Sequence, residues 1–155
     1  MKKLLQHLVS SRPVTWLFVN VIPFIDRPLL RLSRGYLSVS VGQPVVLLAT
    51  RGARTGQIRE TPLIYFRDGD AIVLIASNGG SMRHPAWYHN LRVHPDVTAT
   101  FAGTRERFRA EQVTGPERER LWQAAREHYL GFGKYQTRAG DRQIPVVRLR
   151  PLSGG

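Results

Sequence analysis

The residues best suited to chemistry are three arginines around a bend in the sequence TRGARTGQIRETPLIYF, residues 50–66. Arg51, Arg54 and Arg59 surround two glycines and are followed at once by an apolar run. A hairpin turn needs glycine or a similar turn residue, but it does not need guanidinium groups. Because guanidinium groups form bidentate hydrogen bonds with phosphates and carboxylates, we expect an anion to bind at this bend.

Other familiar catalytic motifs are missing from the sequence. It has no G-x-G-x-x-G, G-x-x-x-x-G-K-[ST] or G-x-S-x-G motif, which are typical of dinucleotide-binding proteins, P-loop NTPases and serine hydrolases. It also has no cysteine, which excludes disulfides and cysteine nucleophiles and favours a cytoplasmic protein. His84, His89 and His94 are five residues apart, a spacing that does not share a helical face, so we expect no metal site. If the chain is an enzyme, its reactive chemistry is expected to belong to a bound cofactor.

The pattern of apolar residues past residue 40 is that of a β protein. Pro85 begins an expected short helix over residues 85–93, and Thr114 with Glu117 predicts a capping box at the start of a longer helix. Hairpin-linked strands with two interposed helices predict an α+β fold built on a small antiparallel barrel. The expected strands cover residues 45–51, 58–66, 71–77, 97–101, 105–113 and 144–150.

The chain has 155 residues, of which 42% are hydrophobic, and this is enough for one domain with a substantial core. We expect a single domain over residues 1–155, with an N-terminal helical segment over residues 1–40 and the barrel over residues 41–150. The formal net charge is +12, from 23 basic and 11 acidic residues. Such an excess is compatible with an anionic ligand, membrane surface or nucleic acid.

The N-terminal part combines the apolar run VTWLFVNVIPFI, residues 14–25, with basic residues. The run is too short to span a bilayer, and no signal-peptide cleavage pattern follows it. Two interpretations stay open: a helix packed on the core, or a segment at the interface of an anionic membrane. The expected location is the cytoplasm, with or without peripheral attachment to the inner face of the cell membrane. The flanking cations are Lys2, Lys3, Arg12, Arg27, Arg31 and Arg34.

Several motifs occur in a fixed order along the chain. They are LLATRGARTGQIRETPLIYFRDGDAIVLIASNGG, PAWYHNL, HP and DRQIPVV, within roughly residues 26–150. Together they resemble the deazaflavin (F420)-dependent nitroreductase family of actinobacterial oxidoreductases. The resemblance implies a split β-barrel of the FMN-binding kind and coenzyme F420 as cofactor, with FMN as the alternative. It also implies transfer of a hydride from C5 of the reduced deazaflavin to a small electrophilic acceptor, such as a quinone, a nitroaromatic or a conjugated carbonyl compound.

The resemblance also implies where the cofactor and the acceptor bind, although it assigns no catalytic residue. Arg54 and Arg59, with Thr55, are expected to hold the anionic tail, and amides between Gly52 and Gly56 are expected to form an anion nest. The other implied cofactor contacts are Thr61, Pro62, Leu63, Ile64, Ile75, Ala76, Ser77, Asn78, Ala86, Trp87, Tyr88 and Asn90. The implied acceptor contacts are Tyr129, Phe132 and Tyr135. The alternative interpretation is that Trp87, Tyr88 and this aromatic stripe belong to the core and that Asn90 bonds locally.

Two positions depart from the family pattern. Ile64 stands where the best-studied kind has tyrosine, and Phe132 replaces the middle member of a three-tyrosine stripe. Losing that phenol removes a proton donor, so a quinone or conjugated carbonyl acceptor is as well supported as a nitroaromatic one. The spacing of three places the stripe on one face if the helix that begins near Pro116 continues.

Two other classes of function are retained as alternatives. One is a flavin- or deazaflavin-binding protein without catalysis, and the other is a basic nucleic-acid-binding module. Arg105, Arg107 and Arg109 share one face of a predicted strand and could follow phosphates. No nucleic-acid motif accompanies them, and such alternation is typical of a solvated strand face, so we expect no nucleic-acid partner. A homodimer is compatible with the sequence.

Overall fold

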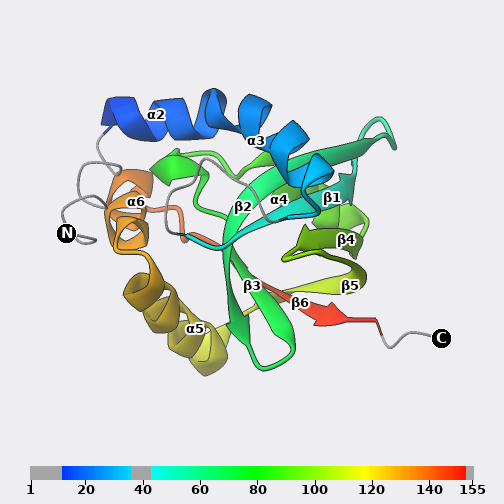
Figure 1. Cartoon of the computed structure of the whole chain (residues 1–155). Coiled ribbons are helices and arrows are strands. Elements are labelled where there is room, and N and C mark those ends of the chain that lie inside the picture. The colour runs from blue at the N-terminus through cyan, green and yellow to red at the C-terminus, as the bar shows by residue number, and fades with distance from the viewer. Residues whose placement is uncertain (1–11, 36–42, 153–155) are drawn as a thin grey trace.

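The computed structural model describes residues 12–35 and 43–152. Its centre is a closed antiparallel barrel with the strand order β1-β2-β3-β6-β5-β4 (Figure 1), in which β4 pairs back onto β1. The small antiparallel barrel and the α+β class expected from the sequence are confirmed. The strands are β1 Val45–Arg51, β2 Ile58–Asp68, β3 Ala71–Ile75, β4 Asp96–Phe101, β5 Thr104–Val113 and β6 Val146–Pro151.

The alternation of side chains along each strand separates two apolar regions. In β1, Val46 and Leu48 belong to the cluster inside the barrel, whereas Val45 and Leu47 face outward and pack with Leu30. This explains why β1 is apolar at successive positions: both of its faces are covered. A second cluster on the outside of the barrel packs β3, β5 and β6 against the C-terminal helices.

Three helices interrupt the later strands: α4 Ala86–Val93, α5 Gly115–His128 and α6 Gly131–Ala139. The expected short helix is therefore confirmed as α4. The longer helix does not continue to Tyr135, because Tyr129 adopts an extended conformation at its end and α6 begins two residues later. Gly131 is required at this join, since a Cβ there would collide with the Tyr129 ring.

The prediction of a capping box at the start of α5 is wrong, because its hydrogen bonds are not formed. Thr114 does precede the helix, but its side chain makes no capping hydrogen bond. Gly115 has φ +65, which departs from the helical geometry that a capping box requires. Glu117 instead accepts hydrogen bonds from Arg120 and Arg148.

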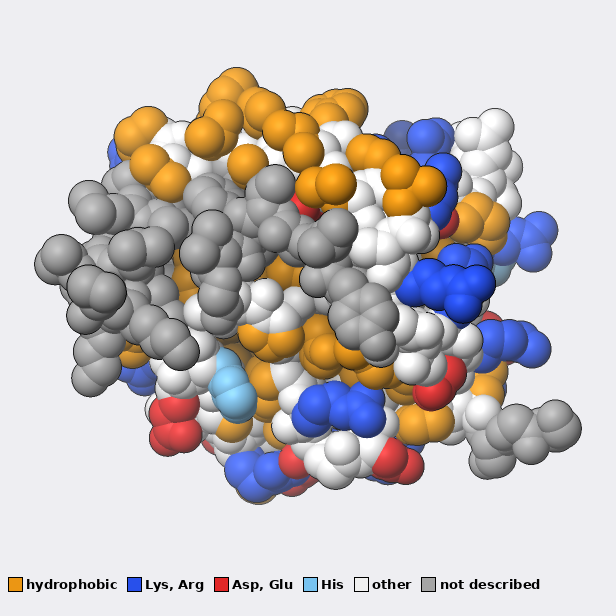
Figure 2. All heavy atoms as spheres, in the orientation of Figure 1, with side chains coloured by type: hydrophobic (Ala, Val, Ile, Leu, Met, Phe, Trp, Pro, Cys, Tyr) orange, Lys and Arg blue, Asp and Glu red, His pale blue; other side chains and the backbone are white. Residues whose placement is uncertain are grey.

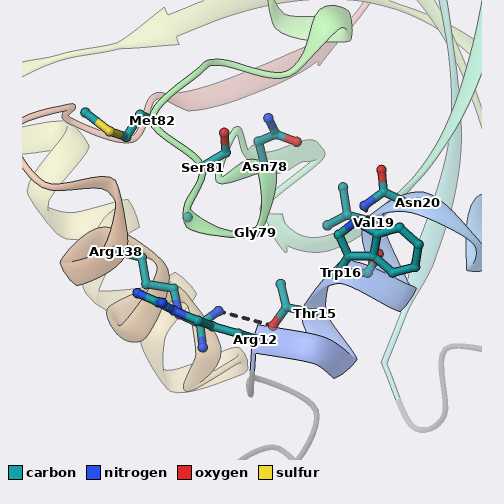
Figure 3. A pocket seen from close by; sticks show the side chains of 11 residues that line it. Arg12, Thr15, Trp16, Val19, Asn20, Asn78, Gly79, Ser81, Met82 and Arg138 are labelled. Carbon is teal, nitrogen blue, oxygen red and sulfur yellow. Dashed lines mark hydrogen bonds between the residues drawn. The ribbon is translucent and has the colours of Figure 1, made fainter.

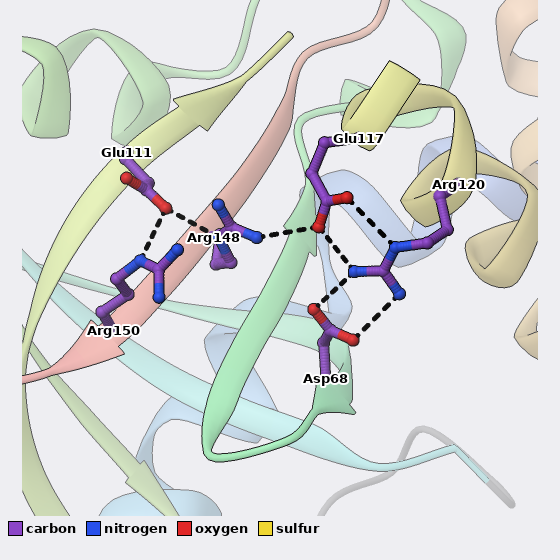
Figure 4. A network of polar contacts seen from close by, with 6 residues as sticks. All are labelled: Asp68, Glu111, Glu117, Arg120, Arg148 and Arg150. Carbon is purple, nitrogen blue, oxygen red and sulfur yellow. Dashed lines mark hydrogen bonds and ion pairs between the residues drawn. The ribbon is translucent and has the colours of Figure 1, made fainter. Parts of the chain in front are cut away.

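These two bonds belong to a network that joins the β2–β3 turn, the first turn of α5 and the strands β5 and β6 (Figure 4). Arg120 contacts Asp68 at 2.9 Å and Glu117 at 2.6 Å. Hydrogen bonding from Arg120 lowers the pKa of both carboxyl groups below their usual range. Each exposed ion pair contributes little to the free energy of unfolding. Because the network joins α5 to the barrel strands, we interpret its role as fixing the position at which α5 begins. Its members are Asp68, Glu111, Glu117, Arg120, Arg148 and Arg150.

Two N-terminal helices, α2 Arg12–Asn20 and α3 Ile22–Leu32, follow one another along one side of the barrel (Figure 1). Leu30 is fully buried against β1, and Arg31 binds Glu60 of β2 at 2.6 Å. The packed-helix interpretation therefore holds for α3. In the part of the chain that the structure describes, no helix is both long and apolar enough to cross a membrane. Lys2 and Lys3 lie outside the described residues.

Candidate functional site

The loop between β1 and β2, together with the start of β2, carries the residues predicted to bind an anionic tail. Arg54 and Thr55 lie in the loop, and Arg59 lies in β2 opposite Thr50 of β1. Arg54, Thr55 and Arg59 are exposed, and neither arginine forms an ion pair with another described residue. The loop is tight, because a Cβ on Gly52 would lie 2.8 Å from the Thr55 hydroxyl oxygen. The structure therefore presents two guanidinium groups to solvent, Arg54 on a closely packed loop and Arg59 at the adjoining start of β2.

The amides of this loop are mostly used within the protein. Gly52 donates to Gln57 O at 2.7 Å and Gly56 donates to Gly52 O at 2.9 Å, while Ala53 donates to the side chain of Asn90. An anion nest over the whole of residues 52–56 is therefore not formed. A bound anion would have to use the amides of Arg54 and Thr55.

The helix α4 holds the loop in place through Asn90. The buried amide of Asn90 accepts from Ala53 N at 3.0 Å and donates to Thr50 Oγ1 at 3.2 Å. Trp87 and Tyr88 are buried in the barrel cluster, and Ala86 is exposed. These contacts agree with the alternative considered from the sequence, in which Asn90 bonds within the fold and Trp87 and Tyr88 join α4 to the core.

The four predicted contacts on β2 lie on both faces of the strand. Thr61 and Leu63 pair with interior residues of β1, whereas Pro62 and Ile64 pair with outward-facing ones. A flat ring packed on β2 can contact one of these pairs but not both. All four side chains are partly exposed, so burial does not distinguish the pairs.

The segment after β3 is tightly shaped by its neighbours. Ile75 and Ala76 are buried on opposite sides of the barrel wall, and Ser77 is also buried. Asn78, Gly79 and Gly80 then have φ values of 48, 63 and 80. A Cβ on Gly79 would lie 2.7 Å from Thr15 Cγ2, and one on Gly80 would lie 2.7 Å from Tyr135 O. Only glycine allows this loop to pass between α2 and α6.

A pocket of about 460 Å³ lies between α2, the loop over residues 78–82 and α6 (Figure 3). Trp16, Val19 and Met82 give it apolar walls, and Arg12 and Arg138 give it two cations. Its described lining contains no carboxylate. The Arg138 guanidinium donates to Thr15 Oγ1 at 3.2 Å, which joins α6 to α2 across the pocket. Among its lining residues, only Asn78 was predicted from the sequence.

The three aromatic residues predicted to contact the acceptor do cluster, but inside the protein. Tyr129, Phe132 and Tyr135 are 4%, 5% and 7% exposed and belong to the cluster between the barrel and the C-terminal helices. The hydroxyls of Tyr129 and Tyr135 are 3.1 Å apart, and burial raises the pKa of Tyr129 above its usual range. The stripe adjoins the pocket through Tyr135, whose backbone lies against Gly80 and whose ring centroid lies 5.6 Å from the Arg138 guanidinium carbon.

One further residue, Arg142, organises this region, although the sequence analysis gave it no role. It lies in the DRQIPVV motif and donates hydrogen bonds to three carbonyl groups of residues 76–81. The quoted motif was the only signal in the sequence. The contacts themselves span more than 60 positions along the chain, so local patterns could not show them.

Two further predictions concern a metal site at the histidines and the arginines on one face of β5. The His84 and His89 rings are 5.8 Å apart, and within residues 12–35 and 43–152 no group of three potential ligands could hold a metal ion. Arg105, Arg107 and Arg109 are all exposed on β5, as expected of a solvated strand face.

Comparisons with known proteins agree on one group of enzymes. A family model described as F420H(2)-dependent quinone reductase matches residues 31–151. An F420H(2)-dependent quinone reductase of Mycobacterium tuberculosis is 45% identical over 109 residues, covering 68% of this chain and 72% of that protein. The structure of F420-H2 Dependent Reductase (FDR-A) has a TM-score of 0.64 at 35% identity, covering 69% of this chain and 94% of its own. A structure described as a domain-swapped dimer has a TM-score of 0.66 at 30% identity, covering 82% and 97%.

Proposed function

The chain belongs to the F420H(2)-dependent quinone reductase family, and from this we infer that it is an oxidoreductase that uses coenzyme F420. It transfers a hydride from F420H2 to a small electrophilic acceptor, for which we propose a quinone. The family match carries the inference, because it covers the barrel together with the β1–β2 loop. Anaerobic mixing of the chain with F420H2 and a soluble quinone tests it. The rival, a protein that binds the cofactor without turnover, predicts no oxidation in that experiment.

The β1–β2 loop fits the chemistry of the cofactor. The tail of F420 carries a phosphodiester and several carboxylates. The loop presents Arg54, and the start of β2 presents Arg59, without ion-pair partners among the described residues. We propose that these two arginines and Thr55 hold the tail. The ring would then contact one face of β2, either Thr61 with Leu63 or Pro62 with Ile64, and extend toward residues 75–78.

The residues of this chain contribute binding, orientation and exclusion of water. When bound, F420H2 supplies the hydride, and the quinone takes up that hydride together with a proton from solvent. We propose that the acceptor occupies the pocket between α2, residues 78–82 and α6, with the stripe of Tyr129, Phe132 and Tyr135 as the layer beneath it. The buried phenols of Tyr129 and Tyr135 bond to each other, so solvent is the simpler source of the proton.

The exposed apolar face of α2 and α3 supports a membrane-associated acceptor. Trp16, Phe24 and Leu32 are 62%, 72% and 85% exposed, and hydrophobic side chains follow one another over these helices (Figure 2). Trp16 also lines the pocket, so the pocket opens beside the apolar face. We propose that this face contacts the anionic inner surface of the cell membrane, from which a lipid-soluble quinone could enter. Arg12 and Arg27 would add electrostatic attraction.

Replacing Trp16, Phe24 and Leu32 together by serine should reduce binding to anionic vesicles more than about tenfold. Each of these apolar side chains contributes about 1.5 kcal/mol or more to binding when it becomes buried in the membrane. Vesicle flotation measures this, with Val93→Ser as the control for an exposed apolar residue on α4. We expect the unaltered chain to float with anionic vesicles more than with neutral ones. Equal flotation of the triple variant and the unaltered chain would contradict the proposal.

We further propose that the chain works as one domain in the cytoplasm, with the N-terminal helices as part of the acceptor site. A homodimer is an additional proposal, supported by the relative described as a domain-swapped dimer.

A further inference from the structure

Arg142 is bonded to both ends of the loop that forms one wall of the pocket. Its Nε donates to Ser81 O at 2.9 Å, its Nη2 to Ser77 O at 2.7 Å and its Nη1 to Ala76 O at 3.2 Å. The wall itself is formed by residues 78–82, so the guanidinium group bridges the start of this loop to Ser81 near its end. One planar side chain thereby sets the distance between Ser77 and Ser81.

The backbone around Arg142 is fixed in turn by a helix α6 side chain. Gln136 Nε2 donates to Arg142 O at 2.9 Å, and Gln136 Oε1 accepts from Ile144 N at 3.0 Å. Both ends of the Gln136 amide are therefore used to hold the backbone of residues 142–144. A guanidinium group held in this way is preorganised for its carbonyl acceptors.

The partners of Arg142 are all neutral groups. No carboxylate of residues 12–35 or 43–152 forms an ion pair with it. Burial lowers the pKa of Arg142 below its usual range, although an arginine remains charged at neutral pH. The wall of the pocket therefore has an uncompensated positive charge directly behind it.

The same guanidinium group determines the state of His84. Arg142 Nη1 lies 2.9 Å from His84 Nδ1, and arginine is only a donor, so Nδ1 must be the acceptor and the imidazole neutral. The pKa of His84 is lowered by its burial and then by the charges of Arg142, His89 and Arg92. The Tyr88 ring packs on the same imidazole at 4.8 Å.

We propose that Arg142 is a positioning residue for the acceptor site: it holds residues 76–81 in the shape that forms the pocket wall and keeps His84 neutral behind it. It does not contact the acceptor. Its effect on turnover rests on the proposed function, whereas its effect on the loop and on His84 does not. Without it, the wall loses three hydrogen bonds and the fixed separation of Ser77 and Ser81.

The test uses Arg142→Met, which removes the charge and the donors at similar length, and Arg142→Lys, which keeps the charge with less suitable donors. Arg109→Met is the matched control, because Arg109 is exposed on β5 and, among the described residues, its ion pair is with exposed Asp96. The first readout is an NMR pH titration of the His84 imidazole in the cofactor-free protein. The second is kcat/KM for menadione with saturating F420H2, expressed per folded molecule.

In Arg142→Met we expect the pKa of His84 to move up toward its ordinary value, because the nearest positive charge is gone. We expect kcat/KM to fall about 10- to 100-fold, as for a small misplacement of a substrate-contacting segment. For Arg142→Lys we expect a His84 pKa and a kcat/KM between those of Arg142→Met and those of the unaltered chain. Arg109→Met should match the unaltered chain in both measurements.

An unchanged His84 titration in Arg142→Met, or an unchanged kcat/KM, would overturn the proposal. If Arg142→Met does not fold, Arg142→Lys decides, and a kcat/KM equal to that of the unaltered chain would overturn it. If the unaltered chain shows no turnover, the proposed function fails, and the titration still decides whether Arg142 holds His84.

Discussion

Replacing Arg54 and Arg59 together by alanine is expected to weaken F420 binding by about 2 to 5 kcal/mol, roughly 30- to 5000-fold in Kd. Both guanidinium groups are exposed and neither is paired with a described carboxylate, so they can bind the anionic tail without first breaking an ion pair. Removing two charges should also flatten the dependence of Kd on salt. The barrel should stay folded, because neither side chain belongs to its core.

Fluorescence titration with oxidised F420 at low and high salt measures this effect. Arg107→Ala with Arg109→Ala is the matched control, since it removes two exposed arginines from β5 and leaves the loop intact. A double variant of the loop that binds F420 as tightly at low salt as the unaltered chain would show that the tail binds elsewhere.

Tyr135→Ala is expected to destabilise the fold by about 3 to 5 kcal/mol, because it removes a large aromatic ring from a packed cluster. This corresponds to a loss of about 6 to 20 °C in Tm. It also leaves the buried Tyr129 hydroxyl without its partner at 3.1 Å. Tyr135→Phe keeps the ring and should cost about 1 to 3 kcal/mol through the unpaired hydroxyl alone.

Thermal unfolding of both variants, followed by kinetics per folded molecule, separates a core role from an acceptor-contacting role. A layer beneath the pocket predicts a large loss of Tm for Tyr135→Ala and little change in the ranking of acceptors. An unchanged Tm with a new ranking of acceptors would show instead that the Tyr135 ring touches the acceptor.

The barrel could be predicted because strand patterns and turn residues are local. The run that became β1 was predicted with its observed limits, Val45–Arg51, and the other strands were found within a few residues. The end of the long helix could not be predicted in the same way. Tyr129 leaves the helix because its ring packs against Phe132 and Tyr135, and this contact depends on the tertiary fold.

The candidate site likewise has features that follow from local sequence and features that depend on the tertiary fold. Arg54 and Arg59 could be expected to lie near each other from the sequence, because one stands in a short glycine-containing loop and the other at the start of the strand that follows it. The pocket could not, because Thr15 and Arg138 meet across 123 positions. The hydrogen bond between Asn90 and Thr50 could not be predicted from local patterns either, because it spans 40 positions.

The most direct test of the account is anaerobic turnover of F420H2 by the purified chain with menadione as acceptor, followed by the return of the absorbance of oxidised F420. We predict saturable oxidation that requires both the chain and the quinone. When reduced FMN replaces F420H2 at the same concentration, we predict that the chain does not increase the rate above that of the direct reaction of reduced FMN with menadione. Oxidation of F420H2 no faster than in buffer, or an equal increase in rate caused by the chain with reduced FMN, would contradict the claim that this chain is an F420H2-dependent quinone reductase.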